Sequence, residues 1–384
     1  MTGQIKTPYY IIHEDKLRRN LELISHVSEQ SGAKIIMAFK ANALWKTFGI
    51  IRDYCQASTA SSLNEMRLSL EFLGNDVHAY CPVYTDTTIG EFVEGCNHIV
   101  FNSVAQYEKY RGFVDGYNSS NAAEKRVSCG LRVNPECSVI ETDIYNPCKP
   151  GSRFGVTRDV LGDVLPEGLE GLHFHCLCES TSYDLEKVLA AFEERFGEFL
   201  PRLKWVNMGG GHLMTREGYD TDHLIDLLRR FRAKYPNLEV ILEPGSAFTW
   251  RTGELIATVL DVVENQGVKT AIIDASFACH MPDCLEMPYK PAITEALAEP
   301  VHGKPTYRIG GNSCLSGDFI GDWSFDKPLA PGDVLTFEDM NHYTTVKTNM
   351  FNGIDHPSMV LLRSDGTVET LREFGYEDYR NRMD

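Results

Sequence analysis

The stretch AKIIMAFK, residues 33–40, decides the fold. It is a short apolar run typical of a buried strand, and a lysine follows it at once. Similar runs recur along the chain, separated by stretches in which apolar residues return at spacings of three and four, as on one face of a helix. Eight such strand–helix units predict a parallel (β/α)8 barrel of the α/β class. The runs are residues 34–39, 56–60, 77–81, 98–101, 127–133, 171–176, 204–208 and 240–243.

The pattern changes after the sequence Glu243-Pro244-Gly245. Longer β-branched runs follow, broken by Gly, Pro, Asp and Asn, which predicts a second, mostly antiparallel β-sandwich or barrel domain. The early segment YYII, residues 9–12, is expected to join that sheet. We therefore expect a barrel over residues 14–250, a β domain built from 1–13 and 251–384, and a linker at 116–124. Helices are predicted at residues 62–73, 184–200 and 221–234.

Composition narrows the function classes. The 384 residues include 37 basic and 54 acidic side chains, a formal net charge of −17, so coating of nucleic acid is excluded. With 43% hydrophobic and 24% charged residues the chain suits a packed globular protein. No run reaches the length of about 18 apolar residues that a membrane span needs, and no signal peptide is visible. The eleven cysteines lack paired spacing, so we expect reduced thiols in a soluble, cytoplasmic protein.

Polar residues stand where predicted strands end, which is where barrel enzymes carry their chemistry. Lys40 ends the first run, His175 nearly ends the sixth, Gly209–Gly211 follows the seventh, and Glu243 ends the eighth. Each has a commonplace explanation on its own: a solvated lysine, a packing histidine, a turn, or a helix-capping acid. We interpret the four together as one site, because all of them would lie at the same end of the barrel.

The set matches what pyridoxal 5'-phosphate (PLP) requires. Lys40 supplies an amine for the cofactor's aldehyde, and His175 supplies a flat ring. The glycine triplet lets backbone N–H groups approach a phosphate. Glu243 would hold a proton on the pyridine nitrogen, which makes the ring a strong electron sink.

A metal site is the alternative for two segments rich in His and Cys. Successive side chains of a strand point to opposite faces, so His173 and His175 would face away from Cys176 and Cys178. The segment from Cys279 to Cys284 lacks the spacing of a structural zinc site. We therefore expect no metal.

Several motifs carry a resemblance to a known family. AFKAN, GLHFHCLCE, MGGG, EPG, GGNSCLSGD and DMNHYTTVKTNMFNG occur in the order found in the alanine racemase-fold, PLP-dependent decarboxylases that act on ornithine, arginine and diaminopimelate. The variants TASSLNE and HMPDCLEMPY are similar to those of the branch that decarboxylates carboxynorspermidine and carboxyspermidine, giving norspermidine and spermidine. The resemblance implies a PLP-binding barrel, a β domain, and a head-to-tail homodimer with shared active sites.

The resemblance also implies individual roles. Lys40 resembles the lysine that binds PLP, His175 the ring-stacking histidine, and Glu243 the partner of the pyridine nitrogen. Cys314 resembles the cysteine that protonates the α-carbon after CO2 leaves, reaching in from the other subunit. The residues implied as phosphate ligands are Gly210, Gly211 and Tyr343.

The substrate's distal end is expected to be cationic. Ser246 replaces the arginine usual after EPG, and Leu315 replaces the acid that follows the cysteine in ornithine- and diaminopimelate-specific relatives. A polyamine needs acidic ligands, although some acids of so anionic a chain simply belong to its surface. The candidate substrate-binding residues are Asp274, His280, Asp283, Asp318 and Tyr343.

Other functions stay open on this scaffold. Decarboxylation of diaminopimelate, ornithine or arginine is the nearest alternative. A racemase is disfavoured, because racemases of this fold pair the pyridine nitrogen with arginine and this chain offers Glu243. A non-catalytic PLP-binding regulator is disfavoured by the presence of both Lys40 and Cys314.

Overall fold

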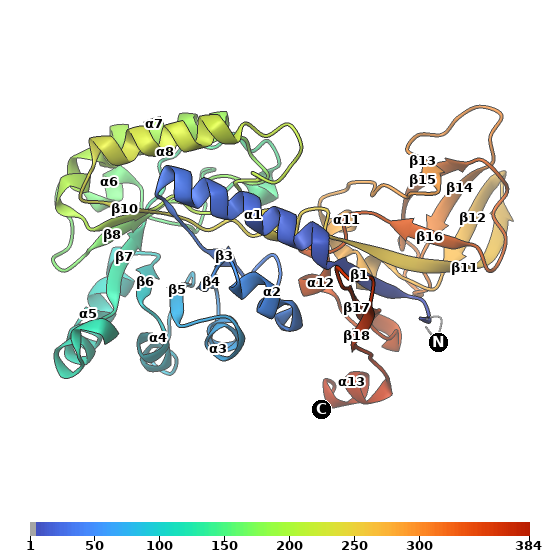
Figure 1. Ribbon diagram of the computed structural model, residues 1–384, viewed down its shortest axis with the longest axis horizontal. Helices are drawn as coiled ribbons and strands as arrows, with labels where there is room; N and C mark the ends of the chain where they lie inside the picture. The colour runs from blue at the N-terminus through green and yellow to red at the C-terminus, as the bar shows by residue number, and fades with distance from the viewer. Residues whose placement is uncertain (1–4) are drawn as a thin grey trace. The chain divides into compact units, whose positions relative to one another are not determined.

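The chain forms two units in the computed structural model, which describes residues 5–384 (Figure 1). Unit 1 combines the N-terminal segment up to Arg19 with Thr249–Asp384, and unit 2 is Asn20–Phe248. Residues 1–4 of the segment predicted to belong to the β domain lie outside the described residues.

Unit 2 holds the predicted parallel barrel. All eight predicted runs form strands, and every pairing between them is parallel. The first run is interrupted at Ile36, so that its first half pairs with the last strand and its second half with the next strand along the chain, which closes the sheet. The strands are β2 (Lys34–Ile35), β3 (Met37–Ala38), β4 (Ala57–Ala60), β5 (Asp76–Tyr80), β6 (His98–Phe101), β7 (Ser128–Arg132), β8 (Gly171–His173), β9 (Trp205–Asn207) and β10 (Glu239–Leu242).

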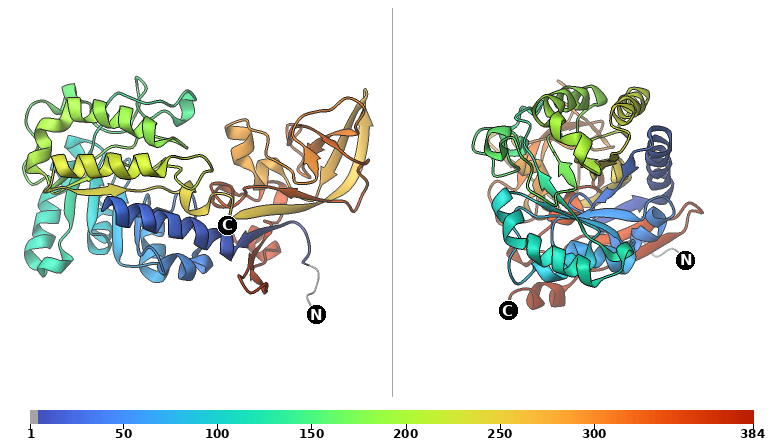
Figure 2. Two further views of the ribbon diagram at one scale, coloured as in Figure 1. Left: turned by 45° about the horizontal axis from the view of Figure 1, so that its top comes forward. Right: turned by 90° about the vertical axis from the view of Figure 1, so that its left-hand side faces the viewer.

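Helices surround these strands (Figure 2). A side chain caps the start of each of the three predicted helices. Ser62 accepts a hydrogen bond from the amide of Glu65, Thr181 from that of Asp184, and Asp220 from that of His223. The linker predicted at 116–124 is wrong in its first half, because the helix before it continues through Ser120. The helices are α1 (Glu14–Ser31), α2 (Phe48–Arg52), α3 (Leu63–Phe72), α4 (Ile89–Gly95), α5 (Val104–Ser120), α6 (Arg158–Leu161), α7 (Ser182–Phe196), α8 (Thr221–Lys234) and α9 (Ser246–Thr249).

Unit 1 is built around a mixed, mostly antiparallel sheet. The YYII segment joins it as expected: β1 (Tyr9–His13) lies between β11 and β17, antiparallel to the first and parallel to the second. The other strands are β11 (Gly253–Asn265), β12 (Val268–Ile273), β13 (Ala296–Leu297), β14 (Thr306–Gly310), β15 (Phe319–Phe325), β16 (Val334–Phe337), β17 (Ser358–Leu362) and β18 (Val368–Arg372). Its short helices are α10 (Phe277–His280), α11 (Pro282–Glu286), α12 (Thr344–Lys347) and α13 (Tyr376–Asn381).

Two expectations from the sequence concern the state of the cysteines and the presence of membrane-spanning helices. All eleven cysteines are free thiols. Among residues 5–384, no helix combines the length and the apolar character that crossing a membrane demands.

A tryptophan packs inside the barrel where two glycines give it room. Trp205 is 2% exposed and belongs to a cluster of buried residues that includes Ile36 and Ile241. A Cβ at Gly171 would lie 2.0 Å from the Trp205 ring, and one at Gly130 would lie 2.2 Å from it. The two neighbouring strands therefore need glycine at the level of this ring.

We expect Gly171→Ala to destabilise unit 2 by about 1–3 kcal/mol, because the added methyl overlaps a ring that is already closely packed. Thermal unfolding checks this as a fall in Tm of several degrees. Gly112→Ala is the control: a Cβ there meets nothing within 4 Å in the interior of α5, so Tm should hold or rise. An unchanged Tm for Gly171→Ala would contradict the packing argument.

Candidate active site

The strand-end residues of unit 2 gather as the sequence predicted for one barrel end. Lys40 follows β3 and is exposed. Burial raises the pKa of Glu65 and lowers that of His175, and the nearby positive charge of Lys40 lowers the pKa of each. Lys40 therefore lies close enough to His175 for its charge to act on the ring.

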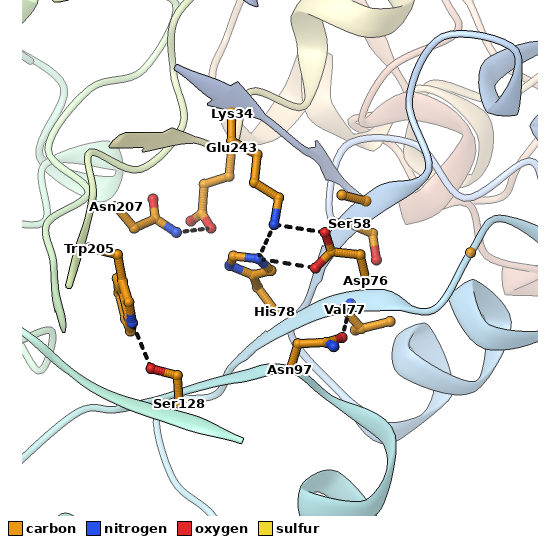
Figure 3. A network of polar contacts seen from close by, with 12 residues as sticks. Lys34, Ser58, Asp76, Val77, His78, Asn97, Ser128, Trp205, Asn207 and Glu243 are labelled. Atoms are coloured by element: carbon orange, nitrogen blue, oxygen red, sulfur yellow. Dashed lines mark hydrogen bonds and ion pairs between the residues drawn. The ribbon is translucent and has the colours of Figure 1, made fainter. Parts of the chain in front are cut away.

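Glu243 is the centre of this group and is only 5% exposed. Its Oε2 accepts a hydrogen bond from Asn207 Nδ2 at 2.9 Å (Figure 3). Its Oε1 lies 3.2 Å from His173 Nε2 and 3.3 Å from His175 Nδ1. The His175 nitrogen also accepts from the amide of Gly210 at 3.3 Å. Three elements that are far apart in sequence thus converge on one carboxylate.

Electrostatics hold this carboxylate ionised and the adjacent rings neutral. Burial raises the pKa of Glu243, but the effect of His173 and then His175 is larger and holds it well below its ordinary value. Burial lowers the pKa of His173, and it lowers that of His175 to about 4. At neutral pH the site therefore presents one buried anion.

The glycine triplet lies directly against this group. Gly209 and Gly211 have positive φ values of 74° and 85°, which only glycine adopts readily. A Cβ at Gly210 would lie 2.5 Å from the carbonyl of Glu243, and one at Gly211 would lie 2.2 Å from that of Leu177. The segment can turn here only because it has no side chains.

These residues fit PLP. Glu243 Oε1 lies within 3.3 Å of His173 Nε2 and of His175 Nδ1, and the His175 nitrogen also accepts from the amide of Gly210. A carboxylate oxygen accepts more than one hydrogen bond, so Oε1 can also take a donor such as a protonated pyridine nitrogen. The same donor atoms of His173, His175 and Glu243 lie within 4.8 Å of one another, as a metal would also require. An adjacent amine and a glycine turn are features that PLP uses and a metal does not.

Two site residues were missed from the sequence. Arg132, 6% exposed, donates to the carbonyl of His175 at 3.2 Å and lies over the rings of Tyr80 and Phe154, each at 4.6 Å. Asn207 holds Glu243. Both end strands that the sequence had identified, so the rule that found Lys40 and Glu243 would have found them too.

A second polar network lies about two residues further down the barrel, towards the N-terminal ends of the strands. Lys34 Nζ is 2.7 Å from Asp76 and 3.4 Å from His78 Nε2 (Figure 3). The His78 ring stacks on that of His98 at 4.0 Å. Asp76, His78 and His98 could also surround a metal. The Lys34 ammonium already neutralises the Asp76 carboxylate. We therefore interpret this network as a structural charge pair inside the barrel.

The other predicted site residues belong to unit 1. Cys314 is exposed on the loop between β14 and β15, and its amide donates to Asn352 Oδ1 at 2.8 Å. Tyr343 is half-buried and precedes α12 with a φ of 46°. Both residues belong to unit 1 and are separate in sequence from the group around Glu243.

The four candidate ligands for amines differ in what they already bind. Asp274 accepts from the amide of Thr258 at 2.8 Å, and Asp318 is buried and accepts three hydrogen bonds. His280 is fully buried, which lowers its pKa to about 4. Asp283 is half-buried and binds the ammonium of Lys347 at 2.8 Å. Asp283 is the candidate that already contacts an amine.

Comparisons with known proteins all identify decarboxylases as relatives of this chain. The profile of the family described as pyridoxal-dependent decarboxylase, C-terminal sheet domain, matches residues 81–341. A carboxyaminopropylagmatine decarboxylase of Synechocystis is 45% identical over 99% of this chain and 96% of its own. A carboxynorspermidine/carboxyspermidine decarboxylase of Campylobacter jejuni is 40% identical over 99% of both chains. The crystal structure of carboxynorspermidine decarboxylase from that organism, complexed with norspermidine, aligns with a TM-score of 0.88 at 39% identity, covering 98% of this chain and all of the other.

We expect the stability of the protein to fall as the pH is lowered from 7 to 5. Burial lowers the pKa of His212, which is 1% exposed, to about 4, and it does the same to His175. Between about pH 6.5 and 4 the unfolded chain therefore binds protons that the folded chain does not, so stability is lost through that window. The loss is about 2 kcal/mol per histidine by pH 5.

Thermal unfolding at pH 7, 6 and 5 measures this. His212→Gln should show a smaller loss of Tm on acidification than the wild type, whereas His302→Gln, at an exposed position, should not. Equal slopes for His212→Gln and wild type would show that His212 does not contribute.

Proposed function

The chain belongs to the family of pyridoxal-dependent decarboxylases, and we propose that it removes CO2 from carboxynorspermidine and carboxyspermidine, yielding norspermidine and spermidine. The observation that carries the proposal is the 40% identity to the Campylobacter jejuni enzyme over 99% of both chains. The converging group around Glu243 supports it, because it offers what the cofactor needs.

Five residues of unit 2 would hold PLP. Lys40 would bind its aldehyde, His175 would lie against its ring, and Glu243 would accept a hydrogen bond from its pyridine nitrogen. The amides at Gly210 and Gly211, with Tyr343 of unit 1, would bind the phosphate. When bound, PLP stabilises the electron pair that remains on the α-carbon as CO2 leaves. Glu243 strengthens that effect by keeping a negative charge beside the ring nitrogen.

Cys314 would return a proton to the α-carbon. The thiol is exposed on its loop, so it can reach a site on another chain. We propose a homodimer in which Cys314 of one subunit completes the site that holds Lys40 of the other. Each site would then combine the barrel domain, 14–250, of one subunit with the β domain, 1–13 and 251–384, of the other. We place this dimer in the cytoplasm.

Acidic residues would bind the distal amines of the substrate. Asp283 is a prediction for this role, and like Glu286 it already pairs with the ammonium of Lys347, with which a substrate amine would have to compete. Asp274, His280 and Asp318 stay predictions for this role. Each already makes contacts within unit 1 that a substrate would have to share.

A second substrate is favoured by one observation. The Synechocystis carboxyaminopropylagmatine decarboxylase is 45% identical to this chain over 381 residues. Its substrate ends in a guanidinium group rather than an amine. Carboxylates bind both groups, so the acids of unit 1 do not separate them.

The test is a panel of CO2-release assays on the holoenzyme with carboxynorspermidine, carboxyspermidine, carboxyaminopropylagmatine, diaminopimelate, ornithine and arginine. We expect kcat/KM to be highest for a carboxypolyamine that ends in an amine. A higher value for carboxyaminopropylagmatine would assign the second substrate. A higher value for diaminopimelate, ornithine or arginine would refute the proposal.

We expect mixed dimers to repair each other. Lys40→Ala chains lack the amine and Cys314→Ala chains lack the proton donor, so a mixed dimer has one site with both defects and one with neither. Random mixing should recover about a quarter of wild-type activity, because half the dimers are mixed and each has one intact site. CO2 release after coexpression measures it. No recovery when mixed dimers are shown to form would mean that both residues act within one chain or that Cys314 is structural.

A further inference from the structure

The loop that carries Cys314 is exposed at its tip but tied at its base by a buried carboxylate. It connects β14 to β15 with the sequence GGNSCLSGD, residues 310–318. Cys314, Leu315 and Gly317 are exposed, whereas Asp318 is only 4% exposed. A carboxylate is costly to bury unless hydrogen bonds replace its water.

Asp318 receives three such hydrogen bonds. Its Oδ2 accepts from the amide of Ser313 at 3.1 Å and from the Ser313 hydroxyl at 2.6 Å. Its Oδ1 accepts from the amide of Ala278 at 3.0 Å. Ala278 belongs to α10, so the carboxylate joins the residue just before Cys314 to a separate helix of the same unit.

The residues on each side of Cys314 are held as well. The Ser313 hydroxyl, itself bonded to Asp318, accepts from the amide of Leu315 at 3.3 Å. The amide of Cys314 donates to Asn352 Oδ1 at 2.8 Å. The backbone that carries the thiol is therefore fixed although the thiol is exposed.

The loop also leaves room for this carboxylate. A Cβ at Gly311 would lie 2.3 Å from Asp318 Oδ2 and 2.6 Å from its Cγ. The amide of Gly311 donates to the Asp318 carbonyl at 2.7 Å. Glycine at this position lets the base of the loop close on Asp318.

We propose that Asp318 is a positioning residue for Cys314: it fixes the loop so that the thiol delivers its proton to the α-carbon of the substrate and not to the cofactor carbon that carried the aldehyde. This rests on the proposed role of Cys314. It also gives Asp318 a function other than the amine binding predicted from the sequence, because its oxygens are directed to the loop and to α10.

The step that Asp318 protects has a distinct chemical failure. When the proton reaches the substrate's α-carbon, the polyamine is released and PLP is regenerated. When it reaches the cofactor's carbon, water instead releases an aldehyde and pyridoxamine phosphate, and that subunit becomes inactive until fresh PLP is supplied. The fraction of turnovers that end this way reports where the proton goes.

The experiment compares holoenzyme variants Asp318→Asn, Ser313→Ala, Cys314→Ala and the double variant Asp318→Asn/Cys314→Ala. Asp326→Asn is the matched control, since this exposed aspartate of the same unit pairs with Lys304 outside the loop. Measurements are kcat and KM for CO2 release, pyridoxamine phosphate formed per CO2, bound PLP by absorbance, and Tm.

Asparagine has an NH2 group in place of one carboxylate oxygen, and this group would face a donor that now bonds to Asp318. The hydrogen bonds on that side of the side chain would be lost, which frees one end of the loop. We expect Asp318→Asn to lower kcat about tenfold and to raise the pyridoxamine phosphate fraction several-fold, with KM changed by less than about twofold. Ser313→Ala should change both in the same direction by less. Asp326→Asn should match wild type.

The double variant decides how Asp318 acts. If it works through Cys314, Asp318→Asn adds nothing to the pyridoxamine phosphate fraction of Cys314→Ala. A further increase would overturn the inference, as would a raised KM with unchanged kcat, which would make Asp318 a substrate ligand.

If Asp318→Asn fails to fold, an unchanged pyridoxamine phosphate fraction in Ser313→Ala overturns the inference. A normal fraction in Cys314→Ala would instead refute the proposed role of the cysteine.

Discussion

Backbone hydrogen bonds along one seam of the barrel constrain the rest of unit 2. Residues 34–38 pair with β10 on one side and with β4 on the other, and the seam continues beyond the strands, where the amide of Ala38 donates to the carbonyl of Pro244 at 3.2 Å. Lys40 ends one side of this seam and Glu243 ends the other. Closing the barrel therefore brings the amine and the buried acid to the same end.

The buried acid sets the chemistry available at that end. Glu243 loses its water, so the polar groups around it decide its charge, and Asn207 and the two histidines keep it ionised. The same burial keeps His175 neutral, with a pKa of about 4. A neutral ring beside an anion suits a protonated pyridine, since it adds no second positive charge.

Unit 1 meets a different physical demand. The strand ends of the barrel are rigid because the sheet holds them, whereas Cys314 lies on a loop that must be reachable. The loop gains its order from Asp318, whose three hydrogen bonds satisfy a carboxylate that is 4% exposed. A reactive side chain can thus be both accessible and oriented.

The periodic spacing of apolar residues was enough to predict much of the fold of this protein. It predicted eight barrel strands, the strand at YYII that joins the second sheet, and Lys40 and Glu243 at strand ends, because burial imposes a period on sequence. It did not reveal which contacts Arg132 and Asn207 make at their strand ends, nor that Asp318 faces its own loop. Those depend on which residues distant in sequence become neighbours when the sheets form, and only the tertiary structure decides that.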